Sequence, residues 1–167
     1  VRLRTDPQQA LSEEYTVEFF LSSRVRPEAL REVYYAFGRA DLLPESTPAL
    51  ETLYQMLTDN PEVKIRLTAH TDRRGTASYN ARLSQQRAES VVRYLIGRGI
   101  ASERLEAAGR GSDEPYTVTK RTAAVHPFLA VGTVLTPNFI ASLTKPEEQA
   151  ICDQLNRRTA FEVRATP

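Results

Sequence analysis

The sequence predicts an α/β fold: a two-layer sandwich with helices packed on one face of a mixed parallel and antiparallel sheet. Segments with strand-like alternation and segments with helical apolar spacing follow one another along the chain. The 167 residues suffice for one domain with a sizeable core. Hydrophobic residues make up 41% and charged residues 26%, which is ordinary for a globular protein and argues against disorder.

The N-terminal part is expected to contribute two strands. Residues 1–30 form a mostly polar lead-in, in which 15–21 (YTVEFFL) is rich in β-forming residues and predicts one strand. The main domain is expected to span 31–167, and its first segment, 31–38 (REVYYAFG), predicts a second strand.

A helix is predicted over 44–61 because apolar residues recur there at helical spacing. Thr47 is expected to cap it, with Pro48 in the favoured first position. Asn60-Pro61 would end it. The predicted apolar stripe consists of Leu50, Leu53, Tyr54 and Leu57.

A strand, a long helix and another strand are expected next. Residues 62–69 alternate apolar and polar side chains, which indicates a half-buried strand. Residues 76–97 carry a helical apolar stripe and end on glycine. The segment 104–111 (RLEAAGRG) predicts a short strand.

The rest of the chain predicts a long insert, a helix and a last strand. The insert covers about 112–143, with a short helix starting at Thr136-Pro137. Thr144 and Glu147 match a capping box that would open the next helix. The closing segment 157–165 (RRTAFEVRA) is expected to be the last strand.

Asp72 stands between a predicted strand and a predicted helix, where ligands bind in open α/β sheets. Gly75 would let the backbone turn there, and the helix start would supply unpaired N–H groups. Two interpretations stay open: Asp72 is a ligand-binding carboxylate, or it is a loop cap that binds nothing.

Arg87 lies beside the apolar stripe of the long helix and is therefore expected to be partly buried and in need of a partner. Asn80, Ser84 and Arg87 form a polar seam directed toward the helix start, where Asp72 lies. The guanidinium either forms a structural salt bridge, with Asp72 or another acid, or it stays separate. In the second case Asp72 would bind an ammonium and Arg87 a carboxylate.

Four stretches together resemble the OmpA-like peptidoglycan-binding domain. They are LTAHTDRRGTASYNARLSQQRAESVVRYLIGRGI (67–100), RLEAAGRGSDEP (104–115), LNRRTAFEV (155–163) and VYYAFGRADLLPES (33–46). The resemblance runs roughly from residue 33 to 163 and follows the family's order of motifs, although the insert is longer than usual in the family.

The resemblance implies noncovalent binding of peptidoglycan through the meso-diaminopimelate residue of the stem peptide, whose free end carries an ammonium and a carboxylate. It also implies a periplasmic location, with an outer-membrane association through a larger parent protein. Similar long inserts occur in OmpA-like domains of multidomain envelope proteins, including ones of the type IX secretion kind. The residues that match the family's binding positions are Asp72, Arg87, Asn80, Thr71, Arg157 and Leu42.

Other function classes find little support in the sequence. There are two histidines and one cysteine, so neither a metal site nor an internal disulfide is expected. No cofactor motif or nucleophile motif stands out, and we expect no catalysis. The net charge of +1 and interleaved acids argue against nucleic-acid binding, and no apolar run is long enough to span a membrane.

One alternative remains, a protein-interaction module of an envelope or secretion assembly that does not bind peptidoglycan. Its support is the apolar content of the insert, in HPFLAVGTVL (126–135) and FIASL (139–143). The same residues could instead pack over the core, which we favour because large apolar patches are seldom exposed.

Overall fold

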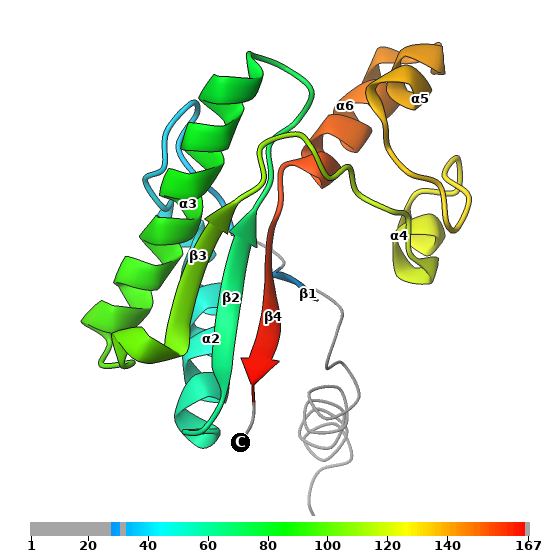
Figure 1. Ribbon diagram of the computed structural model, residues 1–167. Coiled ribbons are helices and arrows are strands. Elements are labelled where there is room, and N and C mark those ends of the chain that lie inside the picture. The colour runs from blue at the N-terminus through cyan, green and yellow to red at the C-terminus, as the bar shows by residue number, and fades with distance from the viewer. Residues whose placement is uncertain (1–27, 31–32, 166–167) are drawn as a thin grey trace, which may run out of the picture.

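A four-stranded sheet lies at the centre of the computed structural model of the chain, which describes residues 28–30 and 33–165 (Figure 1). Its order is β1-β4-β2-β3. Strands β2 and β3 are parallel, whereas β4 runs antiparallel to both β2 and β1, so the predicted mixed sheet is confirmed. The strands are β1 (Glu28–Leu30), β2 (Lys64–Ala69), β3 (Leu105–Gly109) and β4 (Thr159–Ala165).

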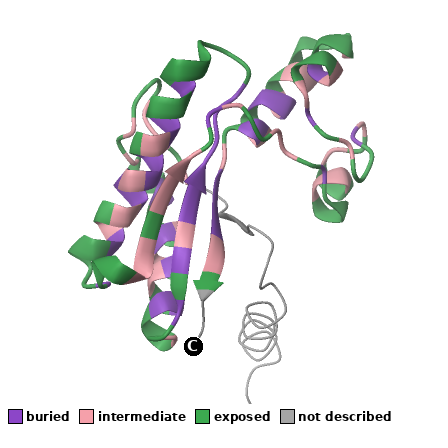
Figure 2. Ribbon diagram, in the orientation of Figure 1, coloured by how far each residue is buried: buried purple, intermediate pink, exposed green. Residues whose placement is uncertain are grey.

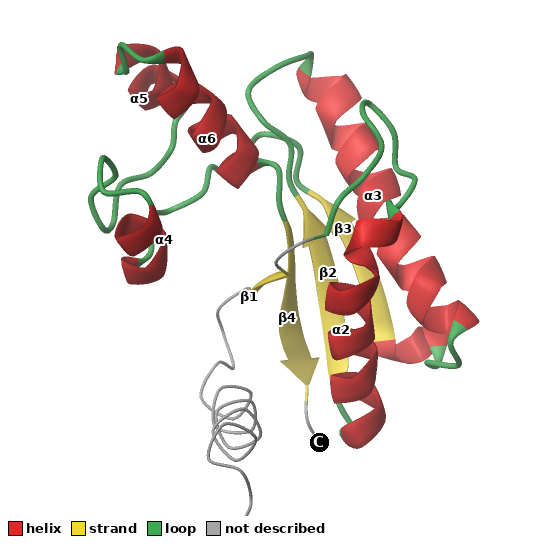
Figure 3. Ribbon diagram, turned by 180° about the vertical axis from the view of Figure 1, so that it is seen from behind, coloured by secondary structure: helices red, strands yellow, loops and turns green. Residues whose placement is uncertain are grey.

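Two long helices, α2 (Thr47–Asp59) and α3 (Ala77–Gly97), cover one face of the sheet (Figures 1 and 3). Helix α3 joins β2 to β3, because parallel neighbours need a long crossover connection. The 3₁₀ turns Pro44–Ser46 and Ser102–Arg104 precede α2 and β3. Both predicted helices and the two-layer arrangement are therefore confirmed.

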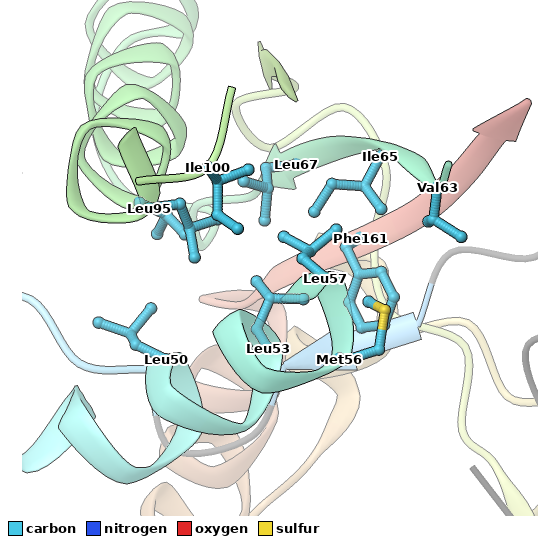
Figure 4. Packing of buried hydrophobic residues seen from close by; sticks show 11 residues of the cluster. Leu50, Leu53, Met56, Leu57, Val63, Ile65, Leu67, Leu95, Ile100 and Phe161 are labelled. Carbon is cyan, nitrogen blue, oxygen red and sulfur yellow. The ribbon is translucent and has the colours of Figure 1, made fainter. Parts of the chain in front are cut away.

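The main core lies between these helices and the sheet (Figure 4). Three members of the predicted stripe of α2, Leu50, Leu53 and Leu57, are buried, and Tyr54 packs partly against them. Strand β2 is buried along most of its length (Figure 2). The core is completed by Met56, Val63, Ile65, Leu67, Val91, Leu95, Ile100 and Phe161.

The insert and the last helix form a second, smaller core beside the end of the sheet where β2 and β3 finish (Figure 1). Its helices are α4 (Lys120–Val125), α5 (Pro137–Ser142) and α6 (Pro146–Asn156). The apolar residues of the insert are thus packed, but in a cluster of their own with α6 and not over the main core. The buried residues of this second core are Val118, Leu129, Leu135, Ile140 and Cys152.

The prediction of a strand over 31–38 is wrong for residues 33–38, the part that the structure describes. Residues 33–38 lead into a turn, and Tyr35 makes only an isolated bridge with Leu42. The edge strand that pairs with β4 on the side away from β2 is β1, which lies within the predicted lead-in. The other predicted strand, 15–21, lies outside the described residues.

Two predicted caps are also wrong. Thr47 is the first residue of α2 and not its cap. Ser46 precedes the helix, but its hydroxyl is bonded to the backbone of Tyr34. The capping box does not form, because α6 begins at Pro146, and a residue before proline is driven out of the helical region.

Of the two short helices in the insert, α5 was predicted and α4 was not. Helix α5 follows its cap Thr136, whose side chain accepts a hydrogen bond from the amide of Phe139 at 3.1 Å, as expected. Helix α4 has no proline at its start to mark it. Thr119 caps it by accepting from the Thr122 amide at 3.2 Å.

Candidate functional site

The candidate site lies where the carboxyl ends of β2 and β3 meet the start of α3 and the start of β4 (Figure 1). The loop after β2 is held on both sides by backbone hydrogen bonds. The amide of His70 donates to the Arg158 carbonyl, and the amide of Thr71 donates to the Gly111 carbonyl, both at 2.8 Å. The loop that carries Asp72 is thereby fixed to the segments that follow β3 and precede β4.

Helix α3 begins at this loop and packs tightly on the end of β3. Thr76 caps the helix by accepting from the Tyr79 amide at 3.2 Å, and Gly75 turns the chain with φ of +87°. At Gly109 a Cβ atom would lie 2.2 Å from the backbone nitrogen of Gln85. Only glycine therefore permits this close approach of β3 to α3.

Asp72 is 9% exposed, and its carboxylate has several internal partners. Oδ1 accepts from the Arg74 amide at 2.9 Å, as in a loop cap. Oδ2 pairs with Nη1 of Arg157 at 2.5 Å and lies 3.7 Å from Nε of Arg74. Asp72 thus acts as a cap and as an ion-pair partner at once.

Arg87 is also 9% exposed, but none of the described acids pairs with it. Its Nε donates to the Arg39 carbonyl at 3.0 Å, and the guanidinium carbon lies 5.0 Å from the centre of the Tyr35 ring. Within the described part of the chain, its two terminal nitrogens make no hydrogen bond, and no carboxylate lies within ion-pair distance. The proposed structural salt bridge of Arg87 is therefore absent from the structure.

The charge of Arg87 is incompletely neutralised by its surroundings. Burial lowers the pKa of the guanidinium, and nearby Arg157 acts in the same direction. Tyr35, Tyr79 and the charge of Asp72 oppose this effect. The guanidinium groups of Arg74, Arg87 and Arg157 thus share this region with the one carboxylate of Asp72, which favours an additional negative charge.

Asn80 and Ser84 hold the loops around the site. Asn80 is 3% exposed, and its amide nitrogen donates to the Arg74 carbonyl at 2.8 Å. Ser84 donates to the Ala81 carbonyl and accepts from the Gly111 amide, both at 2.9 Å. The predicted polar seam is therefore buried, but it acts mainly as a brace for the loops beside Asp72.

Thr71 and Leu42 contribute to the frame of the site. The Thr71 hydroxyl donates to the Asp72 carbonyl at 3.3 Å, and its amide is already bonded. The Leu42 side chain is half-buried and packs against the main core. The loop of Leu42 nevertheless reaches the site through the carbonyl of Arg39, which accepts from Arg87.

Helix α6 supplies two further charged residues, of which sequence reasoning missed one. Arg157 follows the helix and reaches Asp72. Asp153, which is 3% exposed, accepts two hydrogen bonds from Arg73, at 3.0 and 3.3 Å. A lone acid on an amphipathic helix gave no signal of this contact.

Tyr35 is a second residue that was missed, because it was assigned to a strand. Its hydroxyl is hydrogen-bonded to that of Thr159 at 2.7 Å. Burial raises the pKa of Tyr35 to about 12. The ring therefore stays neutral and provides a fixed face for the guanidinium of Arg87.

His70 is buried beside the site. Burial, Arg158 and Arg110 lower its pKa to about 3, and Nδ1 is buried without a hydrogen-bond partner. Among the residues that the structure describes, no group of three or more His, Cys, Asp or Glu side chains could hold a metal ion. No described helix combines the length and the apolar character needed to cross a bilayer.

Several arginines outside the site are paired with acids. Arg66 lies 3.0 Å from Glu106 and 3.2 Å from Glu162 on neighbouring strands. Arg98 pairs with Glu51 at the far end of α3. This pairing agrees with the interleaved acids that argue against nucleic-acid binding.

Comparisons with known proteins agree on one family. The model of the OmpA family matches residues 34–126. Outer membrane protein P5 of Haemophilus influenzae is 35% identical over 86 residues, and outer membrane protein A of Shimwellia blattae is 41% identical over 88 residues. Each match covers 52% of this chain but only 24% and 36% of those proteins.

Solved structures show the same fold at low sequence identity. The cell wall anchor of the T6SS from Pseudomonas aeruginosa is 22% identical, with a TM-score of 0.55, over 98% of this chain and 99% of that chain. The peptidoglycan-associated lipoprotein from Burkholderia pseudomallei is 23% identical, with a TM-score of 0.56, over 79% of this chain and 88% of that chain.

The matched region includes five of the six predicted binding residues, and Arg157 lies beyond it. The match covers more than half of the chain, from the loop before α2 to the end of α4. On this basis the chain belongs to the OmpA family.

Proposed function

We propose that this domain binds peptidoglycan noncovalently through the diaminopimelate residue of the stem peptide, without catalysis. Family membership supports binding in the cell envelope, as do neighbours described as a peptidoglycan-associated lipoprotein and as a cell wall anchor. The fold alone does not select a ligand, so the proposal depends on the chemistry of the site.

The observation that carries the proposal is the guanidinium of Arg87, which belongs to a largely buried residue and has no ion-pair partner among the described residues. A buried charge is costly unless a partner compensates it. Since Arg87 is 9% exposed and has terminal nitrogens without partners in the described residues, a bound carboxylate would supply the missing contact. The planar guanidinium of Arg87 can hold a carboxylate by two parallel hydrogen bonds.

Asp72 would receive the ammonium of the same ligand end group. In the free domain its Oδ2 is paired with Arg157, whose side chain is 38% exposed. An incoming ammonium would compete for Asp72, and Arg157 could then turn to the ligand carboxylate. Charge-assisted bonds are each worth about 1.5–3 kcal/mol, and association costs offset part of this, so we expect a modest affinity for a single site.

The cellular role would be to anchor a larger envelope protein or complex to the cell wall. In that role the domain would lie in the periplasm and be associated with the outer membrane through its parent protein, and the names of the outer membrane relatives support this location. The long insert supports a parent of the multidomain type IX secretion kind, whose other parts would bind partner proteins.

Calorimetric titration with free meso-diaminopimelate, with Nα-acetyl-lysine amide as control, tests the proposal. The control has a side-chain ammonium, but its blocked α-end leaves it without a free carboxylate. We expect saturable binding of diaminopimelate and at least about tenfold weaker binding of the control, because only the former engages Arg87. Equal affinities, or no binding of either compound, would refute the assignment and favour the protein-interaction alternative.

A further inference from the structure

Arg74 lies on the rim of the candidate site, with its backbone fixed and its side chain exposed. Its amide donates to Oδ1 of Asp72 at 2.9 Å, and its carbonyl accepts from the side-chain amide of Asn80 at 2.8 Å. The side chain is 67% exposed, and its Nε lies 3.7 Å from Oδ2 of Asp72. None of the described residues forms a hydrogen bond with the guanidinium. The loop therefore sets the position of this charge, and its donors stay available to a ligand.

The arginines of the neighbouring loops differ from Arg74, because each has an acid of its own. These pairs are Arg39 with Asp41, Arg73 with Asp153 and Arg110 with Glu114, at 2.7, 3.0 and 3.6 Å. By contrast, Arg74, Arg87 and Arg157 share the single carboxylate of Asp72. Among the described residues, the positive charges at the candidate site therefore outnumber the negative ones.

The free end of diaminopimelate leaves this excess of positive charge unchanged. Its ammonium and its carboxylate bring one charge of each sign, so the site stays positive after they bind. The end-group carboxylate would engage Arg87 and Arg157, whereas Arg74 would keep its donors. A guanidinium has donors and no acceptor, so its partner on the ligand must be an acceptor, and an anion suits it best. The charge balance of the site thus favours a ligand with a further anionic group.

We propose that Arg74 binds a second carboxylate of the stem peptide, outside the free end of diaminopimelate; this rests on the proposed function. Two groups supply this chemistry. One is the C-terminal carboxylate, which in a tripeptide belongs to the other stereocentre of diaminopimelate, and the other is the α-carboxylate of the preceding γ-linked glutamate.

The position of Arg74 suits a group next to the end group. The two stereocentres of diaminopimelate are separated by four carbon–carbon bonds, about 5 Å in an extended chain. Nε of Arg74 lies 3.7 Å from the Asp72 oxygen that would hold the ammonium, and the exposed guanidinium is free to turn toward the rest of the ligand. The domain would then prefer a stem peptide in which this second carboxylate is not amidated.

Calorimetric titration with three tripeptides tests the subsite. The first is L-alanyl-γ-D-glutamyl-meso-diaminopimelate, the second carries an amide in place of the glutamate α-carboxylate, and the third carries an amide in place of the C-terminal carboxylate. We expect Arg74→Gln to weaken binding of the first about threefold, because contacts between exposed charges are weak. The substitution should leave unchanged the binding of the amide that lacks the carboxylate held by Arg74. The threefold difference should shrink at about 0.5 M salt, which screens exposed charges.

Two further variants serve as controls. Arg74→Lys keeps the charge and should keep most of the affinity, and neither substitution at this position removes the backbone amide that caps Asp72. Arg93→Gln removes the same charge from an exposed position on α3, about 24 Å along the axis from the start of the helix. This variant should bind all three peptides as the unchanged protein does.

The outcomes separate the subsite from the function on which it rests. If the unchanged protein binds none of the three peptides, the proposed function fails and the subsite with it. If it binds them, but Arg74→Gln changes no affinity, weakens all three equally or behaves as Arg93→Gln does, the subsite alone is refuted. Insensitivity of one amide to Arg74→Gln supports the subsite and identifies the carboxylate that Arg74 binds.

Discussion

The two cores of the molecule differ in how they are built. The main core joins two long helices to three strands, and its side chains follow regular helical and strand spacing. The second core joins α6 to two helices of six residues each and to irregular loops. The main core is therefore made by periodic elements, whereas the second core depends on caps and turns.

The candidate site draws on both regions. Asp72, Asn80 and Arg87 are held by β2 and α3, but Arg157 and Asp153 come from the end of α6. A site at such a junction needs the second core to be folded for its charges to be placed. The following predictions test how far each region controls stability and binding.

The largest expected effect is on the stability of the main core. Leu67 is fully buried in β2, so Leu67→Ala should lower the free energy of unfolding by about 3 kcal/mol through the lost contacts and the cavity. Urea denaturation followed by circular dichroism would measure it.

The matched substitution in the second core is Leu135→Ala, also at a fully buried position. We expect it to reduce hydrogen-exchange protection in α5 and α6 while α3 stays protected, because small units open locally. Equal loss of protection in α3 would show that the two cores unfold as one.

Binding should depend most strongly on the two charges held by the main core. Arg87→Ala and Asp72→Ala should each weaken co-sedimentation with purified sacculi about 100-fold, since each removes charge-assisted bonds to the ligand. Arg93→Ala, an exposed position on the same helix, is the matched control and should bind normally. Unchanged sedimentation of both site variants would contradict the proposed roles.

His70 should make the domain less stable in mild acid. The pKa of its buried side chain is about 3, whereas its ordinary value is 6.5, so between these values the unfolded chain takes up a proton that the folded chain does not. Stability due to His70 is complete above pH 6.5 and is lost as the pH falls toward 3. From pH 7 to pH 5 the loss is about 2 kcal/mol.

The variant His70→Gln tests this assignment. Urea denaturation at pH 7 and pH 5 should show a smaller loss of stability in this variant than in the unchanged protein. His126→Gln, at the only other histidine, serves as the control. The same loss in His70→Gln as in the unchanged protein would place the pH dependence elsewhere.

The smallest expected effect comes from the contact between the second core and the site loop. Asp153→Asn should weaken diaminopimelate binding about fivefold, because Arg73 would lose its charged partner and the loop with Asp72 would be less fixed. Glu148→Gln, on the same helix but paired only with Lys145 at 3.6 Å, should bind normally. Calorimetry would measure the affinities of both variants. An affinity of Asp153→Asn equal to that of the unchanged protein would argue that α6 does not position the loop.

The sequence predicted the periodic region well. The strand before Asp72, the two long helices and the last two strands were all placed, because their apolar spacing is set by the geometry of the elements. One error arose where a tertiary contact overrides local preference, and another where a proline, visible in the sequence, sets the start of the helix. Ser46 uses its hydroxyl on Tyr34 and not on a helix end, and Pro146 prevents the capping box expected at Thr144.

The candidate site was predicted only in part. Spacing along α3 indicated that Asn80 and Arg87 share a buried face, and the structure agrees. The pairing of Asp72 with Arg157 joins residues 85 apart in the chain, and no local pattern reports such a contact. The same holds for Tyr35 beneath Arg87, whose position depends on a turn that was mistaken for a strand.

A crystal structure of the domain soaked with meso-diaminopimelate tests the central claim most directly. The account predicts a ligand carboxylate within hydrogen-bond distance of both terminal nitrogens of Arg87 and a ligand ammonium on Asp72. A ligand bound elsewhere, or an Arg87 that still lacks an anionic partner when the ligand is present, would contradict it.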